Sequence, residues 1–381
     1  MSNLLEDVLV LDFSQFLSGP SASLRLADMG ARVIKIEKPG TGDICRMLYV
    51  SDVKLDGGES TIFHAINRNK ESYTADLKEE ASLEAVRKLV ARADVMLHNF
   101  RPGVMERIGL NYERVKEINS AIIYGEISGY GQEGIWKDLP GQDLLLQAVS
   151  GLTYLTGSQE HPPVPMGVAA ADIIAGTHLG QGVLAALLQR YQSGRGALVQ
   201  VSMLESLLDF QFEVLTCYLN DGHQLPERSA VNGAHAYIAA PYGIYRTADG
   251  YLAIAMAPVP RLGELLGAEA LCRYTQPGDW FTRRDEIKRI LKEVLLQKST
   301  QEWLAVLEPA DVWCADVSTY HDLERHEGYR LLEMEQWVTS GGKKIKTTRC
   351  PVRVNGQLLT SEKGAPLLGE DNERIAREFN L

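Results

Sequence analysis

The chain has 381 residues, 45% of them hydrophobic and 23% charged, which is the composition of a globular protein with enough apolar side chains for a core. At roughly 150 residues per domain, this length predicts two or three domains. The 39 lysines and arginines are outnumbered by 50 aspartates and glutamates. The net charge of −11 argues against general binding to nucleic acids or anionic membranes, which attract positive surfaces.

The N-terminal sequence and the cysteines predict a cytoplasmic protein without a bound metal. The segment MSNLLEDVLVLDF has three acids and no basic stretch, unlike a signal peptide, and no apolar run reaches the roughly 18 residues of a membrane span. The five cysteines are scattered without a CxxC motif, and the eight histidines form no HExxH motif. We therefore expect neither a disulfide framework nor a metal site.

The first two hundred residues alternate between strand and helix patterns. Short apolar runs predict strands at 8–13, 32–37, 94–99 and 121–128. Helices are predicted over 21–30 and over 78–93, where apolar residues recur on one face. Repeated strand–helix–strand units favour parallel pairing with right-handed crossovers. The fold class predicted for this part is a doubly wound α/β domain.

The next segment contains a long predicted helix over 168–192, a strand at 198–203 and a helix at 204–219. From Pro226 onward the pattern changes. Segments on either side of TADG, at 241–246 and 251–256, are typical of an antiparallel hairpin, and amphipathic helices follow through about residue 307. This region predicts a smaller α+β domain.

The end of the chain, APLLGEDNERIAREF, predicts a helix that packs back on the first domain. The predicted organisation is therefore discontinuous. It comprises a large domain over 1–200 completed by about 345–381, a helical linker over 201–224, a small domain over 225–325 and a return linker over 326–344.

A glycine-rich segment, GYGQEG at 129–134, fits the G-x-G-x-x-G pattern and follows a predicted strand. The sequence after it, IWKDLPGQD, contains a proline and does not favour a helix that begins at the third glycine. Without that helix, a phosphate would lack the dipole and the converging N–H groups that dinucleotide sites use. We interpret the segment as a loop at a strand end.

Asp172 is the candidate catalytic residue that the composition of its surroundings singles out. It lies in GVAAADIIAGTHLGQG, so its carboxylate is desolvated unless a specific group pairs with it. Such a placement is typical either of a catalytic group or of an aspartate that caps a helix. An aspartate in a partly apolar site can act as a nucleophile on an activated acyl group. The residues alone leave both interpretations open.

Basic residues of the first domain fall mainly in predicted loops, and loops at the carboxyl ends of parallel strands bind ligands in α/β folds. The segment HNFRPG at 98–103 directly follows its strand and offers backbone N–H groups, an amide and a guanidinium. We expect most of these cations to be solvated surface charges, with Lys38 and Arg101 as exceptions. The set comprises Lys38, Arg46, Arg68, Lys70, Lys78, Arg101 and Arg107.

Many segments, in order along nearly the whole chain, resemble the class III CoA-transferase family of formyl-CoA and carnitine CoA-transferases and α-methylacyl-CoA racemases. Agreement over so many separate segments is far more specific than any single motif. They include LDFSQFLSGPSASLRLADMGARVIKIEKPGTGD, NRNKESYTADLK, ADVMLHNFRPGVMERIGL, GQDLLLQAVSGLTYLTG, DIIAGTHLGQGVLAALLQR, GRGALVQVSMLESLL, APYGIYRTADGYLAIA and PLLGE.

The resemblance implies a fold, an assembly and residue roles. The fold would be a large Rossmann-like domain built from both chain ends plus a small α+β domain, and two chains would form an interlocked homodimer. The family's nucleophilic aspartate falls on Asp172. Gln142 and Asp143 would line the acyl site. The residues in contact with coenzyme A would be Leu17, Ser18, Lys38, Ala75, Lys78, Asn99, Phe100, Arg101 and Arg107.

The activity implied by the resemblance is transfer of coenzyme A from an acyl-CoA to a small carboxylic acid through an aspartyl-CoA thioester. Coenzyme A is then a substrate, and no tightly bound cofactor is expected. Formyl-CoA transferases carry a glycine-rich lid where this chain reads RSAVNGAHAYIAAPYG, so specificity for formyl-CoA and oxalate is not implied.

Three alternatives stay open: an acyl-CoA racemase with the same pocket, a nicotinamide-dependent oxidoreductase, and a non-catalytic CoA-binding protein. The missing helix after GYGQEG argues against the second, and Asp172 argues against the third. Racemases of the family have a histidine where this chain has Gln142, and a glutamate before a proline where it has Ala257. Glutamine cannot transfer a proton, which argues against the racemase.

Overall fold

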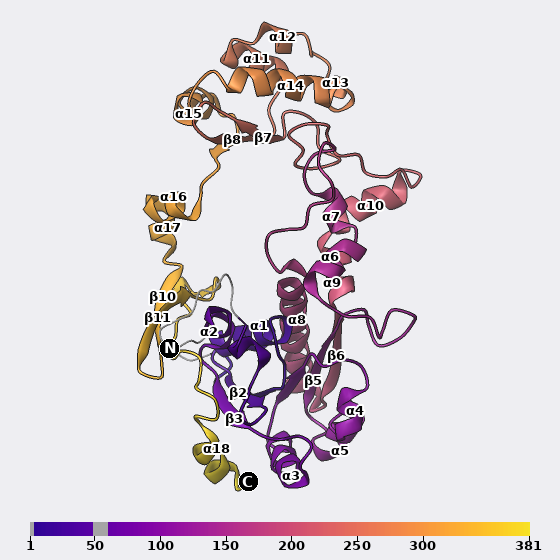
Figure 1. Ribbon diagram of the computed structural model, residues 1–381, viewed down its shortest axis with the longest axis vertical. Coiled ribbons are helices and arrows are strands. Elements are labelled where there is room, and N and C mark those ends of the chain that lie inside the picture. The colour runs from indigo at the N-terminus through magenta and orange to yellow at the C-terminus, as the bar shows by residue number, and fades with distance from the viewer. Residues whose placement is uncertain (1–3, 49–59) are drawn as a thin grey trace. The chain divides into compact units, whose positions relative to one another are not determined.

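The computed structural model describes residues 4–48 and 60–381 (Figure 1). These residues form two compact units. The first unit takes Met1–Leu146, Ala169–Phe210 and Leu331–Leu381, and the second unit takes Gln147–Val168 and Gln211–Arg330. The chain therefore leaves the first unit twice and returns to it twice.

The first unit is built on a six-stranded parallel sheet with the order β3-β2-β1-β4-β5-β6. This is the strand order of a Rossmann-type sheet, and it confirms the predicted α/β class. Five strands lie within a few residues of their predicted positions. The strands are β1 (Leu9–Asp12), β2 (Arg32–Glu37), β3 (Glu71–Thr74), β4 (Val95–His98), β5 (Ile123–Ser128) and β6 (Ala197–Ser202).

The edge strand β3 was not predicted, because its sequence ESYT has no apolar run. Polar contacts hold it instead: Glu71 accepts from Arg32 of β2, and the Ser72 hydroxyl donates to Glu37 at 2.7 Å. Its other edge receives the C-terminus. The Thr74 N–H donates to Asn372 Oδ1 at 2.9 Å, at the start of α18 (Asn372–Phe379). The predicted packing of the C-terminal helix on the first domain is confirmed (Figure 1).

Helices of the first unit bury apolar stripes against the sheet. The predicted stripe on α3 (Glu80–Val90) is buried with Leu11, Ile34 and Met96 of the strands. Each fully buried Leu or Val contributes about 1.5–3 kcal/mol. The remaining helices are α1 (Ser18–Asp28), η1 (Ile44–Arg46), α2 (Thr61–Asn67), α4 (Val104–Ile108), α5 (Tyr112–Ile118), α8 (Ala170–Ser193) and α9 (Met203–Phe210). Helix α6 (Asp143–Val149) begins in the first unit and ends in the second.

Helix α8 packs against α1 and against β5 and β6. It is the single helix among the described residues that is long and apolar enough to cross a membrane by length and composition, although polar residues interrupt its apolar stretches. Glycines on the packed faces allow it to approach the sheet closely. A Cβ on Gly182 would lie 2.6 Å from Val199 of β6, and one on Gly125 of β5 would meet Leu179 of α8 at 3.0 Å.

Two short hairpins also belong to the first unit. The strands β10 (Glu335–Ser340) and β11 (Lys343–Thr348) pair antiparallel in a segment for which no strand was predicted. The strands β12 (Arg353–Val354) and β13 (Gln357–Leu358) form a second, shorter pair.

The second unit has an antiparallel sheet and a helical layer. Strands β7 (Gly243–Arg246) and β8 (Tyr251–Ile254) form the hairpin predicted around TADG, and β9 (Cys314–Asp316) extends it. The helix predicted over 204–219 is two helices, α9 and α10 (Phe212–Asn220), separated at Gln211. The other helices are α7 (Leu152–Leu155), α11 (Val259–Leu266), α12 (Glu269–Cys272), α13 (Pro277–Thr282), α14 (Arg284–Leu295), α15 (Thr300–Leu307), η2 (Glu308–Ala310) and α16 (Tyr320–Arg325). A further helix, α17 (Glu327–Leu332), ends at the boundary with the first unit.

Candidate active site

A cavity of about 960 Å³ lies at the carboxyl-terminal edge of the parallel sheet. Loops that follow β1, β4 and β5 line it together with residues 137–144 and the first turn of α8. This edge is where open α/β sheets bind their ligands. The charged side chains in the lining are Arg101, Arg107, Lys137, Asp138, Asp143 and Asp172.

Asp172 lies in the first turn of α8 but does not cap it. The N-cap residue is Ala169, and no side chain of α8 caps its own N-terminus. The Ala171 N–H donates instead to Asp143 Oδ1 at 2.7 Å. Of the two interpretations that the sequence left open, helix capping therefore belongs to Asp143, and the Asp172 carboxylate faces the cavity.

The surroundings of Asp172 make its carboxylate more basic than usual. Burial, and secondly the neighbouring Asp143 carboxylate, raise the pKa of Asp172 to about 6. The polar groups of Ser18 oppose this rise in the pKa of Asp172. At neutral pH the group is ionised yet partly desolvated, which is the state of a carboxylate nucleophile or base.

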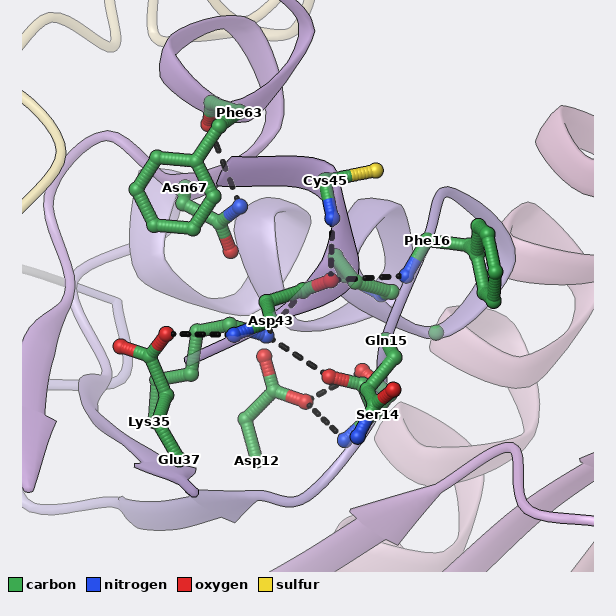
Figure 2. A network of polar contacts seen from close by, with 12 residues as sticks. Asp12, Ser14, Gln15, Phe16, Lys35, Glu37, Asp43, Cys45, Phe63 and Asn67 are labelled. Carbon is green, nitrogen blue, oxygen red and sulfur yellow. Dashed lines mark hydrogen bonds and ion pairs between the residues drawn. The ribbon is translucent and has the colours of Figure 1, made fainter. Parts of the chain in front are cut away.

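The loop at 14–18, which brings Ser18 to the cavity, is fixed by buried charges (Figure 2). Lys35 Nζ lies 2.8 Å from Asp43 Oδ2 and donates to the Ser14 carbonyl at 2.7 Å. Asp43 Oδ1 accepts the Phe16 N–H at 3.2 Å. Phe16 has φ +62°, a left-handed conformation that costs a non-glycine residue about 1 kcal/mol or more, so this contact offsets backbone strain.

A second pair of side chains fixes the loop after β4. His98 Nδ1 accepts the Phe100 N–H at 3.3 Å, and Nε2 of the same ring lies 3.4 Å from Glu126 of β5. Glu126 also accepts from Gln132, in the loop after β5, at 2.9 Å. These contacts connect the loop after β4, which carries Arg101, with the loop after β5, which contains the GYGQEG segment.

The structure brings together eight of the twelve candidate site residues. Leu17, Lys38, Ala75 and Lys78 are not part of the cavity lining. Lys38 and Lys78 are exposed near the ends of β2 and β3, and Ala75 is buried in the core. The residues in the lining are Ser18, Asn99, Phe100, Arg101, Arg107, Gln142, Asp143 and Asp172.

The expectation of solvated surface charge was wrong for three cations. Arg68 is buried in an ion pair with Asp28, and Lys70 Nζ lies 3.0 Å from Asp12 Oδ2, with both side chains fully buried. Arg46 pairs with Glu37 at 2.7 Å and covers the Phe63 ring. A loop position did not predict exposure, because each of these cations has a buried acid opposite it in the fold.

Lys137 and Asp138 are cavity residues that the sequence analysis missed. They lie in IWKDLPGQD, directly after GYGQEG, and their position after a predicted strand was the available signal. No helix begins at Gly134, as predicted, and the next helix is α6. The two ends of the loop meet closely, since a Cβ on Gly129 would lie 2.7 Å from the Gly141 Cα. Among the residues that the structure describes, no cluster of three potential metal ligands occurs.

Comparison with known proteins identifies the family. The family described as "CoA-transferase family III" matches residues 5–372. The chain belongs to CoA-transferase family III. An acetyl-CoA:oxalate CoA-transferase from Acetobacter aceti is 33% identical over 98% of this chain and 95% of its own. Further CoA-transferases that are 30% to 32% identical have names that pair succinyl-CoA or succinate with another dicarboxylic acid.

A racemase is also among the similar proteins. The human α-methylacyl-CoA racemase is 29% identical to this chain over 99% of its length and 94% of the racemase. Among solved structures, a CaiB/BaiF family protein from Brucella suis superposes with a TM-score of 0.85, at 30% identity and 98% coverage of both chains. The fold of this member of family III is thus shared with a relative over nearly the whole chain.

Proposed function

We propose that the protein transfers coenzyme A from an acyl-CoA to a free small carboxylic acid, with Asp172 as the nucleophile. The observation that carries this proposal is a partly buried carboxylate, with a pKa of about 6, that faces a 960 Å³ cavity with cations in its lining. An acyl-CoA has a long part that carries the phosphates and a thioester end. The cations of the lining suit the phosphates, and Asp172 suits the thioester.

Each step of the proposed reaction balances without metal, ATP or redox partner. The Asp172 carboxylate attacks the donor thioester, which gives a mixed anhydride and CoA thiolate. The thiolate attacks the Asp172 carbonyl carbon and releases the donor acid, which leaves an aspartyl-CoA thioester. The acceptor carboxylate attacks this thioester to give a second anhydride and CoA thiolate. The thiolate then attacks the acceptor's carbonyl carbon, which releases the new acyl-CoA and regenerates Asp172.

The proposed binding roles follow the charges of the site. Arg101, Arg107 and Lys137 line the cavity and would neutralise phosphates of coenzyme A. Lys38 and Lys78, exposed at the same sheet edge, would contact the more distal phosphate or ribose groups. Gln142 and Asp143 lie in the lining beside Asp172, where the acyl group or the acceptor acid would be held.

The second candidate activity is racemisation, which one relative of the chain performs by name. It requires an acid–base pair on either side of the α-carbon. Among the described residues, the cavity lining contains no histidine, and Gln142 offers no transferable proton. Incubation with a 2-methylacyl-CoA in deuterium oxide should therefore leave the α-carbon unlabelled. Labelling at turnover rates without an acceptor acid would favour the racemase.

A homodimer is part of the proposal and is supported by the exposed face of α8. Leu188 and Tyr191, one helical turn apart, are 66% and 91% exposed, and Phe210 at the end of α9 is 47% exposed. Exposed large apolar side chains of this kind favour a surface that another chain covers. Light scattering of the purified protein should give twice the mass of 42.2 kDa.

The proposed activity is tested by a mass-spectrometric screen. Acetyl-CoA and succinyl-CoA, offered separately against a pool of mono- and dicarboxylic acids, should yield at least one new CoA thioester. Rapid acid quenching followed by peptide mapping should place a CoA adduct on the peptide that contains Asp172. New thioesters without that adduct would refute the covalent role of Asp172, and a wide screen without products would refute the activity.

A further inference from the structure

The 14–18 loop after β1 forms its backbone hydrogen bonds with side chains of neighbouring segments. It belongs to no helix or strand before Ser18, so its N–H groups need acceptors from elsewhere. Three successive N–H groups find these acceptors in side-chain oxygens of three different segments. They are Ser14 with Asp12 Oδ1 at 3.0 Å, Gln15 with Asn99 Oδ1 at 2.8 Å, and Phe16 with Asp43 Oδ1 at 3.2 Å.

Asn99, directly after β4, contacts this loop through both polar atoms of its amide. Asn99 Nδ2 donates to the Gln15 carbonyl at 2.7 Å and to Ser18 Oγ at 3.2 Å, while Oδ1 accepts the Gln15 N–H. The two bonds with the Gln15 backbone fix the orientation of the amide, and both N–H donors are in use. A phosphate or carbonyl oxygen of a ligand could accept from this amide only by displacing one of these bonds. The Asn99 side chain is therefore committed to the loop.

The conformation that these contacts hold is strained. Phe16 has φ +62°, which residues with a side chain rarely adopt, and Asp43 accepts its N–H from the side opposite Asn99 (Figure 2). The turn into α1 is also tight, since a Cβ on Gly19 would lie 2.2 Å from Ser14 Cβ and 3.4 Å from Asn99 Cγ. Strained backbone persists only where surrounding contacts fix it, so the loop should relax when Asn99 is removed.

This loop lies next to the helix that carries Asp172. Helix α1, which the loop begins, packs on α8, where a Cβ on Gly176 would lie 2.5 Å from the Ser18 carbonyl oxygen. Gly176 is one turn after Asp172. Phe16 and Ser18 are in the same cavity lining as Asp172, and Phe16 is 43% exposed. A misplacement of about 1 Å in such surroundings can lower a reaction rate by about 10²-fold.

We propose that Asn99 is a positioning residue for the transfer reaction, whose amide holds the 14–18 loop in the strained conformation that places Phe16 and Ser18 in the cavity lining. The inference rests on the proposed function. It gives the Asn99 side chain a role different from the coenzyme A contact that the family resemblance implies. Removal of a side chain that only binds coenzyme A raises KM at constant kcat, whereas removal of a positioning residue lowers kcat.

The test compares Asn99→Ala with wild type at saturating acyl-CoA. Exchange of ¹³C-succinate into succinyl-CoA, and of ¹³C-acetate into acetyl-CoA, measures the reaction without knowledge of the acceptor. We expect kcat to fall by about 10- to 100-fold and KM to change less than about threefold. Hydrogen–deuterium exchange reports on the loop independently of activity. The amides of residues 15–18 should exchange at least about tenfold faster, because the Gln15 N–H loses its acceptor.

Asn119 provides a matched control outside the cavity lining. Its Nδ2 donates to the Val90 and Ala93 carbonyls at 3.0 and 2.8 Å, and its Oδ1 accepts the Ala121 N–H at 3.1 Å. Asn119→Ala thus removes a similar set of three bonds from another loop of the same unit. It should lower the melting temperature about as much as Asn99→Ala and leave kcat and the amide exchange of residues 15–18 unchanged.

A second variant, Asn99→Asp, removes the donors without leaving a gap. It retains an oxygen for the Gln15 N–H but cannot donate to the Gln15 carbonyl or to Ser18 when ionised, so kcat should fall and amide exchange should rise here too. Circular dichroism and the melting temperature show whether each variant is folded. If Asn99→Ala does not fold, Asn99→Asp carries the comparison, with Asn119→Asp as its control.

The outcomes separate this inference from the proposed function. An unchanged kcat in a folded Asn99 variant, at any KM, would overturn the positioning role and leave the nucleophile in place. A lower kcat without faster amide exchange at 15–18, or an equal loss of kcat in the Asn119 variant, would overturn it as well. A wild-type enzyme that exchanges label without a CoA adduct on the Asp172 peptide would overturn the nucleophile. A wild-type protein that exchanges no label would overturn the activity, and the role of Asn99 with it.

Discussion

Asp12 and Asp172 are two buried carboxylates of the same unit whose pKa values shift in opposite directions. Asp12, at the end of β1, has Lys70 3.0 Å away and accepts from the Ser14 and Ser23 hydroxyls. Burial alone would raise its pKa, but Lys70 and Lys35 hold it well below its usual range. Asp172 has another acid as its neighbour and keeps a raised pKa.

The comparison shows that burial by itself does not mark a catalytic group. A buried carboxylate that is paired with cations stays ionised and has a structural role. A buried carboxylate without a cation within hydrogen-bond distance can remain reactive, and its burial lowers the stability of the fold. The two sites are connected, because the network around Asp12 and Lys35 fixes the loop that brings Ser18 into the same cavity lining as Asp172.

The largest effect is expected for Asp172→Asn. The rate of CoA transfer should fall by about 10⁴-fold or more, since an amide is not a useful nucleophile. Isotope exchange with acetyl-CoA and succinyl-CoA measures the loss, and calorimetric titration with coenzyme A should show binding intact. Glu113→Gln, exposed on α5 and outside the cavity lining, serves as control. A variant that kept a tenth of the wild-type rate would refute the assigned chemistry.

Asp12→Asn should have the opposite character. It leaves Lys70 buried without its partner charge, and the free energy of unfolding should fall by about 3–5 kcal/mol. Urea denaturation at pH 7, followed by circular dichroism, measures the change. The matched control is Glu117→Gln, in an ion pair that is 67% exposed on both sides, where about 0–1 kcal/mol is expected. Equal effects of the two substitutions would contradict the structural role of the network.

Asp172→Asn should also stabilise the protein at neutral pH. The folded-state pKa of Asp172 is raised to about 6 from 3.8, so ionisation costs stability in the folded state. This cost is absent below about pH 4, grows between about pH 4 and 6, and is constant above. Allowing for its partial exposure, the variant should gain about 1–2 kcal/mol above pH 6 and nothing below pH 4. Urea denaturation across this range checks the sign, and a constant difference at all pH values would argue against a titrating Asp172.

The smallest effect concerns the rim of the cavity. Arg101→Ala should raise the KM for acyl-CoA by about tenfold with kcat nearly unchanged, because a phosphate contact far from the thioester is equal in ground and transition states. The effect should shrink with added salt. Arg114→Ala, on exposed α5, is the control. A fall in kcat at constant KM would remove Arg101 from the phosphate site.

The sequence predicted the parts of the fold that depend on local apolar patterns. Five strands, the helix that begins at Ala170, and the TADG hairpin are where periodicity placed them. It missed β3, which is held by polar partners from distant segments, and the break at Gln211, where the chain passes from one unit to the other. Both depend on tertiary context, which local patterns do not contain.

The candidate site was predictable in its main residue but not in its support. Alanines and isoleucines around Asp172 signalled a desolvated carboxylate, and the structure bears this out. The sequence analysis expected Arg46, Arg68 and Lys70 to be solvated surface charges. No sequence rule reveals that a buried acid will face each of them in the fold. The cavity lining also joins Ser18 and Asp172 from segments far apart in the chain. The available signal for the close packing of α1 on α8 was Gly176, where a Cβ would lie 2.5 Å from the Ser18 carbonyl oxygen.

The discontinuity of the first unit has a consequence for the order of synthesis. Its sheet begins at Leu9, yet the edge of β3 is completed by Asn372, and Ile375 of α18 is buried among residues of the N-terminal half. The residues that complete this edge follow the whole second unit in the chain, so they leave the ribosome after it. The sheet of the first unit is therefore completed only after the second unit has been synthesised. Until then, the edge strand β3 lacks the partner that the C-terminal segment provides.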